Sequence, residues 1–211
     1  MSLLATEPAF SVLDVAPVEH AAAPTLAFAL HVSDPDGREI HTIALSAQVR
    51  IDPARRTYDP DTRARLVELF GAPERWAATT HSFQWAHVDV LVPGFTGATS
   101  FTLELPCSYD LELAAVKYFY SLPDGDIPLS FHFTGMVLYA GEHDRLQVAQ
   151  VPWSCSTQWM MPVEAWRRAI RAFYPEGGWV RLTTATLDAL LERKSARGDH
   201  DFDQTIRGLL G

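Results

Sequence analysis

Cysteine is scarce in this chain, whose 211 residues include only Cys107 and Cys155. The two do not form a CxxC pair, so the sequence offers no disulfide framework. Reduced thiols are the usual state of a protein in the cytoplasm. The cysteine content therefore favours a cytoplasmic location.

Long apolar runs are absent as well. No uncharged apolar stretch reaches 18 residues, so the sequence predicts no membrane-spanning helix. The N-terminal stretch MSLLATEPAFSVLDVAP has no basic region and carries Glu7 and Asp14, which argues against a secretory signal. We therefore expect a soluble protein of the cytoplasm.

Basic residues are few, with 17 Lys and Arg against 26 Asp and Glu and a net charge of −9. Residues 1–161 carry 9 basic against 19 acidic side chains, whereas residues 162–211 carry 8 against 7. The one dense basic cluster is Arg167, Arg168 and Arg171, which we interpret as the solvated face of a helix. Because phosphate backbones bind to concentrated basic surfaces, nucleic acid is not an expected partner.

The common catalytic motifs are missing. The sequence contains no GxxxxGK or GxGxxG loop, no GxSxG elbow, and no HxH or HxxxH pair among its eight histidines. We therefore assign no catalytic residue, cofactor or metal ligand, and the balance leans away from an enzyme. His81 and His87 would share one face of an expected strand and, with His132, would be the metal ligands if there were any; ordinary histidines of a sheet are the favoured interpretation.

Cys107 is the candidate reactive thiol. It lies just before an expected helix, where backbone amides lower the pKa of a thiol. The alternative is a packed, inert cysteine, because cysteine is among the most frequently buried residue types.

Residues 101–139 have the clearest periodicity in the chain. Apolar residues alternate from Phe101 to Leu105, as in a half-buried strand, and Pro106 ends the pattern. Apolar residues at three- and four-residue steps then predict a central helix from Asp110 to Leu122, capped by Ser108 or Asp110. The turn 123–126 leads into a second strand that ends near Tyr139.

The rest of the chain extends this pattern on both sides. The segments Thr25–Ser33 and Glu39–Ile51 alternate around Asp34-Pro35-Asp36-Gly37, which predicts a β-hairpin. We expect a short helix capped by Asp59 or Asp61, a strand over 81–92, and a further strand over 146–151. A helix is expected to start at Pro162, and Thr184 and Asp201 are expected to cap the two helices that follow.

Strands followed by helices indicate an α+β fold. We expect a mainly antiparallel sheet of five to seven strands, one central helix and a C-terminal layer of about three helices. Residues 1–23 would be an arm or edge strand, and residues 24–211 a single domain that is rich in strands over 24–151 and in helices over 162–211. The nearest alternative is a two-sheet sandwich with appended helices.

The segment VPWSCSTQWMMPVEAWRR has the most unusual composition in the chain. Aromatic residues and Met are enriched at contact surfaces, where they offer large apolar area at little cost in entropy. The candidate partner-binding residues are therefore Trp153, Trp159, Met160, Met161 and Trp166. The alternative is that these side chains hold the helices onto the sheet.

Several stretches resemble an uncharacterised bacterial family of about this length; they are LPCSYD (105–110), KYFYSLPDGDIPLSFHFTG (117–135), VPW (151–153), MPVEAWRRAI (161–170), FYPEGGWVRL (173–182), ARRTY (54–58) and LFGAPERW (69–76). Members of that family are typically encoded beside oxygen-tolerant uptake [NiFe]-hydrogenase genes. The resemblance implies an accessory role in hydrogenase assembly or function, with a hydrogenase subunit or maturation factor as partner, and brings no catalytic residues.

A weaker resemblance to SecB-type export chaperones lies in the order strand, Pro/Cys break, helix and strand. A SecB-like chaperone, a small-molecule-binding protein, and a metal- or thiol-dependent enzyme are therefore the alternatives to the accessory role. Homo-oligomerisation is left open.

Overall fold

The computed structural model describes residues 2–3, 7–107, 110, 113–141, 143, 145–175, 177 and 180–211. The sequence predicts a single domain over 24–211, whereas spatial contacts divide the chain into two compact units, Met1–Gly177 and Gly178–Gly211. In the described part of the chain, no helix combines the length and the apolar character needed to cross a membrane.

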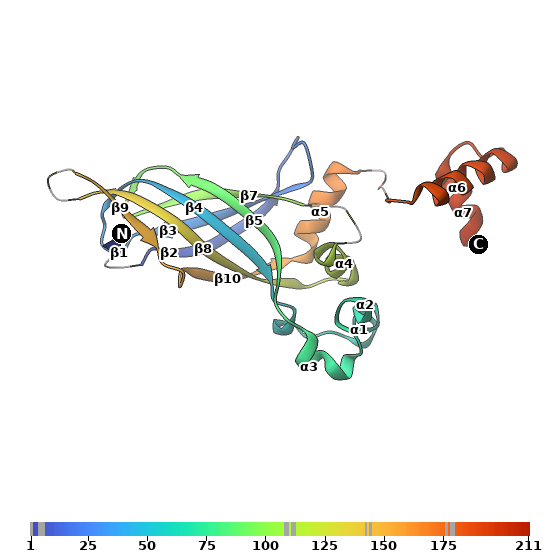
Figure 1. Ribbon diagram of the computed structural model, residues 1–211, viewed down its shortest axis with the longest axis horizontal. Helices are drawn as coiled ribbons and strands as arrows, with labels where there is room; N and C mark the ends of the chain where they lie inside the picture. Colours follow the sequence, from blue (N-terminus) through green and yellow to red (C-terminus); the bar gives the residue numbers. More distant parts are fainter. Residues whose placement is uncertain are drawn as a thin grey trace. The chain divides into compact units, whose positions relative to one another are not determined.

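Among the described residues, every strand lies in the first unit (Figure 1). They are β1 (Ser2–Leu3), β2 (Ala9–Pro17), β3 (Thr25–Ser33), β4 (Glu39–Ile51), β5 (Phe83–Val92), β6 (Phe95–Thr96), β7 (Ala98–Pro106), β8 (Asp126–Ala140), β9 (Leu146–Val151) and β10 (Ser156–Pro162). Its helices are η1 (Pro53–Arg55), α1 (Pro60–Arg65), α2 (Val67–Phe70), η2 (Pro73–Arg75), α3 (Trp76–Thr79), α4 (Ala114–Ser121) and α5 (Val163–Phe173).

Among the described residues the strands form two sheets. The seven-stranded sheet has the order β1-β9-β8-β4-β5, with β10 also paired to β8 and β6 to β4, and the three-stranded sheet has the order β2-β3-β7. Every pairing is antiparallel except that of the two-residue strand β1 with β9. The predicted α+β class with a mainly antiparallel sheet is confirmed, and the strands are shared between two sheets.

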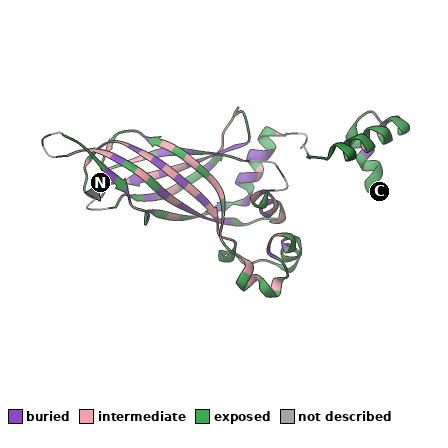
Figure 2. Cartoon of the chain, viewed as in Figure 1, coloured by how far each residue is buried: buried purple, intermediate pink, exposed green. Residues whose placement is uncertain are grey.

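The two sheets pack face to face through alternate side chains. In β4 the residues from Ile43 to Ile51 alternate between buried and half-buried (Figure 2). Phe28 of β3 meets Phe131 of β8 with ring centroids 5.4 Å apart, and Phe10 of β2 stacks on Phe133 of β8 at 4.3 Å. These aromatic contacts between strands of different sheets form the centre of the core.

The predicted hairpin over Thr25–Ser33 and Glu39–Ile51 is wrong, although both strands have the predicted bounds. β3 pairs with β2 and β7, while β4 pairs with β5 and β8, so the turn at Asp34 crosses from one sheet to the other. The Asp34 carboxylate accepts hydrogen bonds from the backbone N and Nε of Arg38, and its backbone N donates to the Gly97 carbonyl at 2.7 Å. These bonds stabilise the turn. The same turn geometry can connect two strands of different sheets or two paired strands of a hairpin.

The central helix α4 is shorter than predicted. It begins at Ala114, Leu113 occupies the N-cap position without a side-chain cap, and the predicted cap Ser108 lies outside the described residues. Val116, Tyr118 and Phe119 are buried on its inner face. Figure 1 shows α4 and α5 together at one end of the strands, and α5 contacts β2, β3 and β10.

The strand β10 is not expected from the sequence, which predicts after the central helix only the strand that ends near Tyr139 and the strand over 146–151. β10 pairs with the first half of β8, from Ser156 opposite His132 to Pro162 opposite Asp126. The Trp/Met-rich segment is therefore part of the seven-stranded sheet up to Pro162, and α5 begins directly after it.

The second unit consists of α6 (Thr184–Arg197) and α7 (Phe202–Leu210). Thr183 caps α6, one residue earlier than predicted, and Gly198 ends it in the left-handed region at φ +68°. Asp201 caps α7 as predicted, because its Oδ1 accepts a hydrogen bond from the backbone N of Gln204 at 2.8 Å.

Candidate functional site

The five residues proposed for partner binding do not share one surface. Met161 and Trp166 are buried, Trp159 is half-buried, and Trp153 and Met160 are exposed, with 87% of the Trp153 surface open to solvent. Alternation along β10 explains the difference between Met160 and Met161, because successive side chains of a strand point to opposite faces. Of the five, Trp153 and Met160 are therefore the most exposed.

Trp166 and Trp159 stabilise the core. Trp166 packs its ring against Phe119 and Tyr120 of α4, both at 5.4 Å between centroids, and so joins α5 to α4. Trp159 meets Phe28 of the opposite sheet edge-on at 6.0 Å. For these two tryptophans the contacts favour the packing role over the partner-binding role.

Trp153 lies in the connection between β9 and β10, beside a surface groove of about 400 Å³. Thr134, Gln150 and Glu7 line the groove together with Trp153 and its neighbours. The hydroxyl of Ser154 donates to Oε1 of Glu7 at 2.7 Å. The groove thus combines one large exposed aromatic side chain with a polar rim.

Cys107 is buried immediately after β7. Its backbone N donates to the carbonyl of Pro24 at 2.7 Å, and its Sγ lies 3.6 Å from the carbonyl oxygen of Leu105. Burial raises the pKa of the thiol to about 12, and α4 does not begin until Ala114. A thiol in this setting stays protonated at neutral pH, whereas reactive cysteines are exposed thiolates.

The candidate metal-binding histidines are separated. His81 precedes β5, which begins at Phe83, so it does not share a strand with His87 as expected. Gln48 of β4 pairs with His87 of β5 on one side and with His132 of β8 on the other. The backbones of the two histidines are therefore two strand spacings apart, about 10 Å. No group of three metal-ligating side chains occurs among the residues that the structure describes.

An exposed cluster of Ser46, His87 and Asp89 has the residue types of a hydrolase. Ser46 Oγ lies 2.6 Å from Nε2 of His87 and donates to Oδ1 of Asp89 at 2.6 Å. Because the hydroxyl proton goes to the carboxylate, His87 has to donate to the serine oxygen. A nucleophilic serine requires a histidine that accepts its proton, so this cluster does not form a catalytic triad. The strand register that brings Ser46 opposite Asp89 is not visible in the sequence.

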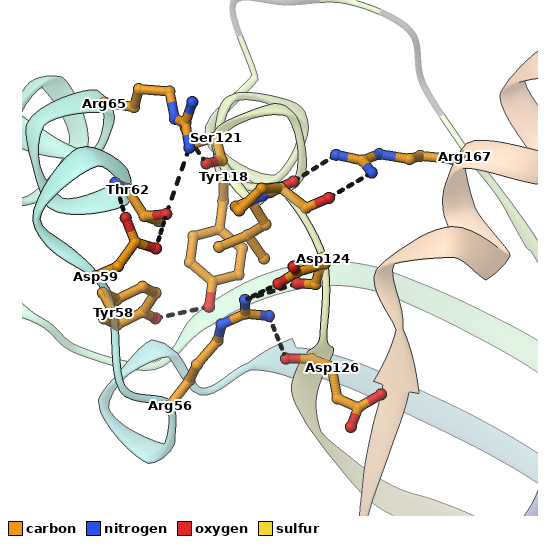
Figure 3. Close-up of polar contacts among 12 residues, drawn as sticks. Arg56, Tyr58, Asp59, Thr62, Arg65, Tyr118, Ser121, Asp124, Asp126 and Arg167 are labelled. Carbon is orange, nitrogen blue, oxygen red and sulfur yellow. Dashed lines mark hydrogen bonds and ion pairs between the residues drawn. The ribbon is translucent and has the colours of Figure 1, made fainter.

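Two arginines from the segment between β4 and β5 hold the turn after α4 (Figure 3). Arg56 donates from Nη2 to the carbonyl of Asp124 at 2.6 Å and from Nη1 to that of Asp126 at 2.7 Å. Arg65 donates from Nε to the carbonyl of Ser121 at 3.1 Å. Ser121 is the last residue of α4, and its carbonyl has no partner within the helix, so the guanidinium of Arg65 supplies one.

Arg167 of α5 binds the same turn from the other side, donating to the carbonyls of Leu122 at 2.5 Å and Pro123 at 2.6 Å (Figure 3). The adjacent Arg168 is exposed. The basic cluster that the sequence indicates as a solvated face thus contains one arginine with a structural role. The sequence around Arg167 does not reveal this role, because the carbonyls that it binds, those of Leu122 and Pro123, lie more than 40 residues earlier in the chain.

A second concave site lies where the segment after β4 meets α1 and α3. It is a pocket of about 270 Å³ whose walls include Tyr58, Trp76 and Arg63. The rings of Tyr58 and Trp76 meet edge-on at 5.5 Å, and the pocket is also lined by Thr80. Thr80 Oγ1 is buried and has no hydrogen-bond partner within the described part of the chain.

In the first unit, two facing and mainly antiparallel sheets with helices at one end define an α+β sandwich. The chain belongs to a family of unknown function, DUF6084, whose profile matches residues 5–211. The predicted membership of an uncharacterised family is therefore confirmed. No curated protein matches the chain.

Two solved structures share a distant likeness. The solution structure of a protein assigned to the late embryogenesis abundant (LEA) class is 14% identical, with a TM-score of 0.35 over 75% of this chain and 72% of that chain. β-Glucosidase 3B from Thermotoga neapolitana, in complex with α-D-glucose, is 12% identical, with a TM-score of 0.24 over 72% of this chain and 17% of that chain. At these TM-scores neither likeness supports an argument about this protein.

Proposed function

We propose that this protein is a non-catalytic accessory protein of the cytoplasm that binds another protein through the surface around Trp153. The family resemblance described above implies that the partner is a [NiFe]-hydrogenase subunit or one of its maturation factors. The observation that carries the proposal is the exposure of Trp153 at the mouth of a groove.

Exposed tryptophan is unusual enough to need an explanation. Tryptophan is enriched among the side chains that contribute most to protein interfaces, where it fills a pocket of the partner and is surrounded by a polar rim. Trp153 has such a rim in Gln150, Ser154 and Glu7. Covering this ring would remove a large apolar area from water, which is the main favourable contribution to most protein association.

The charge of the first unit indicates the kind of partner surface. Residues 1–177 carry 12 Lys and Arg against 21 Asp and Glu, so this unit holds the whole net charge of −9. Complementary potentials accelerate association and weaken with salt. The partner should therefore present a basic surface, and complex formation should slow as ionic strength rises.

Affinity purification of the tagged protein from its native cell, under conditions that express hydrogenase, tests this function. Wild-type protein should recover a hydrogenase subunit or maturation factor, and Trp153→Ala should lose it, because truncating an anchor costs about 2 kcal/mol or more, roughly a 30-fold loss of affinity. Leu91→Ala is the matched control, since Leu91 is also an exposed apolar side chain, on β5. Equal recovery by both variants would assign binding to another surface.

Two further outcomes bear on the accessory role. Recovery of no hydrogenase component, together with normal hydrogenase maturation in a deletion strain, would contradict it. Recovery of many unrelated unfolded chains, with suppression of their aggregation by the purified protein, would favour the SecB-like alternative instead.

A small-molecule-binding function is the second candidate, and the pocket beside Trp76 favours it. Two aromatic walls, the guanidinium of Arg63 and the unsatisfied hydroxyl of Thr80 are suited to a small planar ligand with an acceptor group. Native mass spectrometry of protein purified from its own cell tests this function. A bound mass that disappears in Trp76→Ala would support it.

A further inference from the structure

An extended segment of the chain lies on the β9 edge of the seven-stranded sheet. β1 is next to β9 in the strand order, and the two strands pair in parallel, with Ser2 opposite Ala149. Leu3 follows opposite Gln150. We call residues 2–8 the arm; positions 4–6 lie outside the described residues. The β9 edge therefore accepts an added backbone, as the edges of sheets commonly do.

The arm keeps one register as far as the groove beside β9. Oε1 of Glu7 accepts the hydrogen bond from Ser154, and Glu7 is part of the groove wall. Sγ of Cys155 lies 3.5 Å from the carbonyl oxygen of Pro8. The residues of each of these contacts are 147 positions apart in the chain, as are the paired residues of β1 and β9. The described residues of the arm thus run beside 149–155 without a change of register.

The arm is held weakly. β1 has two residues, whereas strands of folded proteins usually have about three to ten, and parallel pairing is slightly less stable than antiparallel pairing. The hydrogen bond between Ser154 and Glu7 is exposed to water, and the thiol of Cys155 is a weak donor. Opening of the arm therefore costs little free energy, as it does at frayed ends of other chains.

The β9 edge also has apolar side chains that stay exposed. Leu146 and Val148 are 59% and 42% exposed, and among the described residues no strand pairs with them on the side away from β8. Val148 and Gln150 share the outer face of the sheet, because alternate residues of a strand point to the same side. Met136 of β8 lies opposite Gln150 and is 48% exposed. A longer extended segment would cover these side chains and reach Trp153 as well.

Charge indicates which residues such a segment should carry. The first unit holds the whole net negative charge, and the arm adds the carboxylate of Glu7 to the groove. An acidic arm gains no attraction from an acidic surface, whereas a segment with Lys or Arg residues does. A basic segment with an apolar residue at every second position is therefore favoured over the arm.

We propose that the β9 edge is a docking site for an extended, basic segment of the partner protein, which displaces the arm and pairs with residues 146–151 beside Trp153. Peptides are often recognised as an added strand, because main-chain hydrogen bonds supply affinity and alternate side chains supply specificity. The inference rests on the proposed function, since it states how the partner of the Trp153 surface is bound.

A disulfide that locks the arm in place tests this mode of binding. In the variant Leu3→Cys/Gln150→Cys the new cysteines occupy paired positions of adjacent strands, about 4.8 Å apart, which a disulfide can bridge. The oxidised variant should bind the purified hydrogenase component that wild type recovers at least about 10-fold more weakly than the reduced variant, because the lock removes the binding-competent state. Ser33→Cys/Ala98→Cys, which links paired positions of β3 and β7, is the control and should bind equally in both states.

Amide hydrogen exchange of the same variant measures opening of the arm without the partner. Exchange in β9 should be slower in the oxidised than in the reduced form, because the arm opens only in the reduced form. Equal exchange in the two forms would overturn the proposal, as would failure of the disulfide to form.

Binding separates a failure of this inference from a failure of the proposed function. Equal binding by the oxidised and reduced forms would overturn docking on the β9 edge, and loss of the partner by Trp153→Ala in that case would leave the proposed function standing. Recovery of no hydrogenase component by wild type would contradict the proposed function, and the docking site with it.

Discussion

The hydroxyl of Tyr58 lies 2.7 Å from the hydroxyl of Tyr118 (Figure 3) and also 2.7 Å from the carbonyl oxygen of Pro53. A carbonyl oxygen only accepts, so Tyr58 donates to Pro53 and Tyr118 has to donate to Tyr58. Tyr118 is fully buried, and burial raises its pKa well above the ordinary value. This hydrogen bond therefore joins α4, which contains Tyr118, to the segment after β4, which contains Tyr58.

Phenylalanine at these two positions should have unequal effects on stability. Tyr58→Phe leaves the buried Tyr118 hydroxyl without an acceptor and should cost about 1–3 kcal/mol. Tyr118→Phe leaves the bond from Tyr58 to Pro53 intact and should cost only about 1 kcal/mol, the net value of one hydrogen bond. Urea unfolding of both variants measures the difference, and the reverse order would contradict the donor assignment.

The adjacent arginines of α5 provide a second matched pair. Arg167→Ala removes two hydrogen bonds to the carbonyls of Leu122 and Pro123 and should lower the free energy of unfolding by about 1.5–3 kcal/mol. Arg168→Ala makes the same change in charge at an exposed position and should stay within about 0.5 kcal/mol of wild type. Similar losses in both variants would mean that net charge, and not the hold on the turn, explains the effect.

The α+β class and many boundaries could be predicted because they depend on local patterns. The alternation of apolar and polar residues predicts the bounds of β3 and β4. Asp201 could be predicted as the cap of α7 because it carries a side-chain oxygen and directly precedes the helix. The pairing of β3 and β4 could not be predicted, because the turn at 34–37 fits both a hairpin and a crossing between sheets. Local chemistry is the same in both cases, and only contacts with distant strands distinguish them.

The candidate site was harder to predict than the fold. Trp159, Met160 and Met161 are three large apolar residues in a row, which hides the alternation of β10 and made the segment look like one contact surface. Because β10 pairs with β8, the side chain of Met161 points into the core and that of Met160 points toward solvent. Exposure of Trp153 follows from its place in a connection after Pro152, where no strand of the described residues pairs with it.

The tryptophans should separate in stability measurements. Trp166→Ala should cost about 3–5 kcal/mol, since it leaves a cavity between α5 and α4. Trp153→Ala removes a side chain that is 87% exposed and should stay within about 0.5 kcal/mol of wild type. Thermal or urea unfolding gives both values. A large loss in Trp153→Ala would show that this ring contributes to folding, and its effect on binding could then not be read as loss of an anchor.

Burial of Cys107 predicts loss of stability at alkaline pH. The thiol has a pKa of about 12 in the folded protein against an ordinary value of 9, so the folded state keeps a proton that the unfolded state loses. Its contribution is therefore complete below pH 9 and is lost as pH rises from 9 to 12. Over that range the free energy of unfolding should fall by about 1.4 kcal/mol per pH unit for this thiol.

Cysteine variants isolate that contribution. Burial also raises the pKa of Cys155, to about 11, and that of Tyr58, so wild type should lose more than one proton's worth of stability above pH 9. Cys107→Ala should reduce the slope of unfolding free energy against pH by about one proton, while Cys155→Ala should reduce it over a narrower range. Urea unfolding from pH 8 to 11 gives the slopes. Parallel curves for wild type and Cys107→Ala, or rapid labelling of native Cys107 by a thiol reagent at pH 8, would show that this thiol ionises in the folded protein and would return it to the candidates for a reactive site.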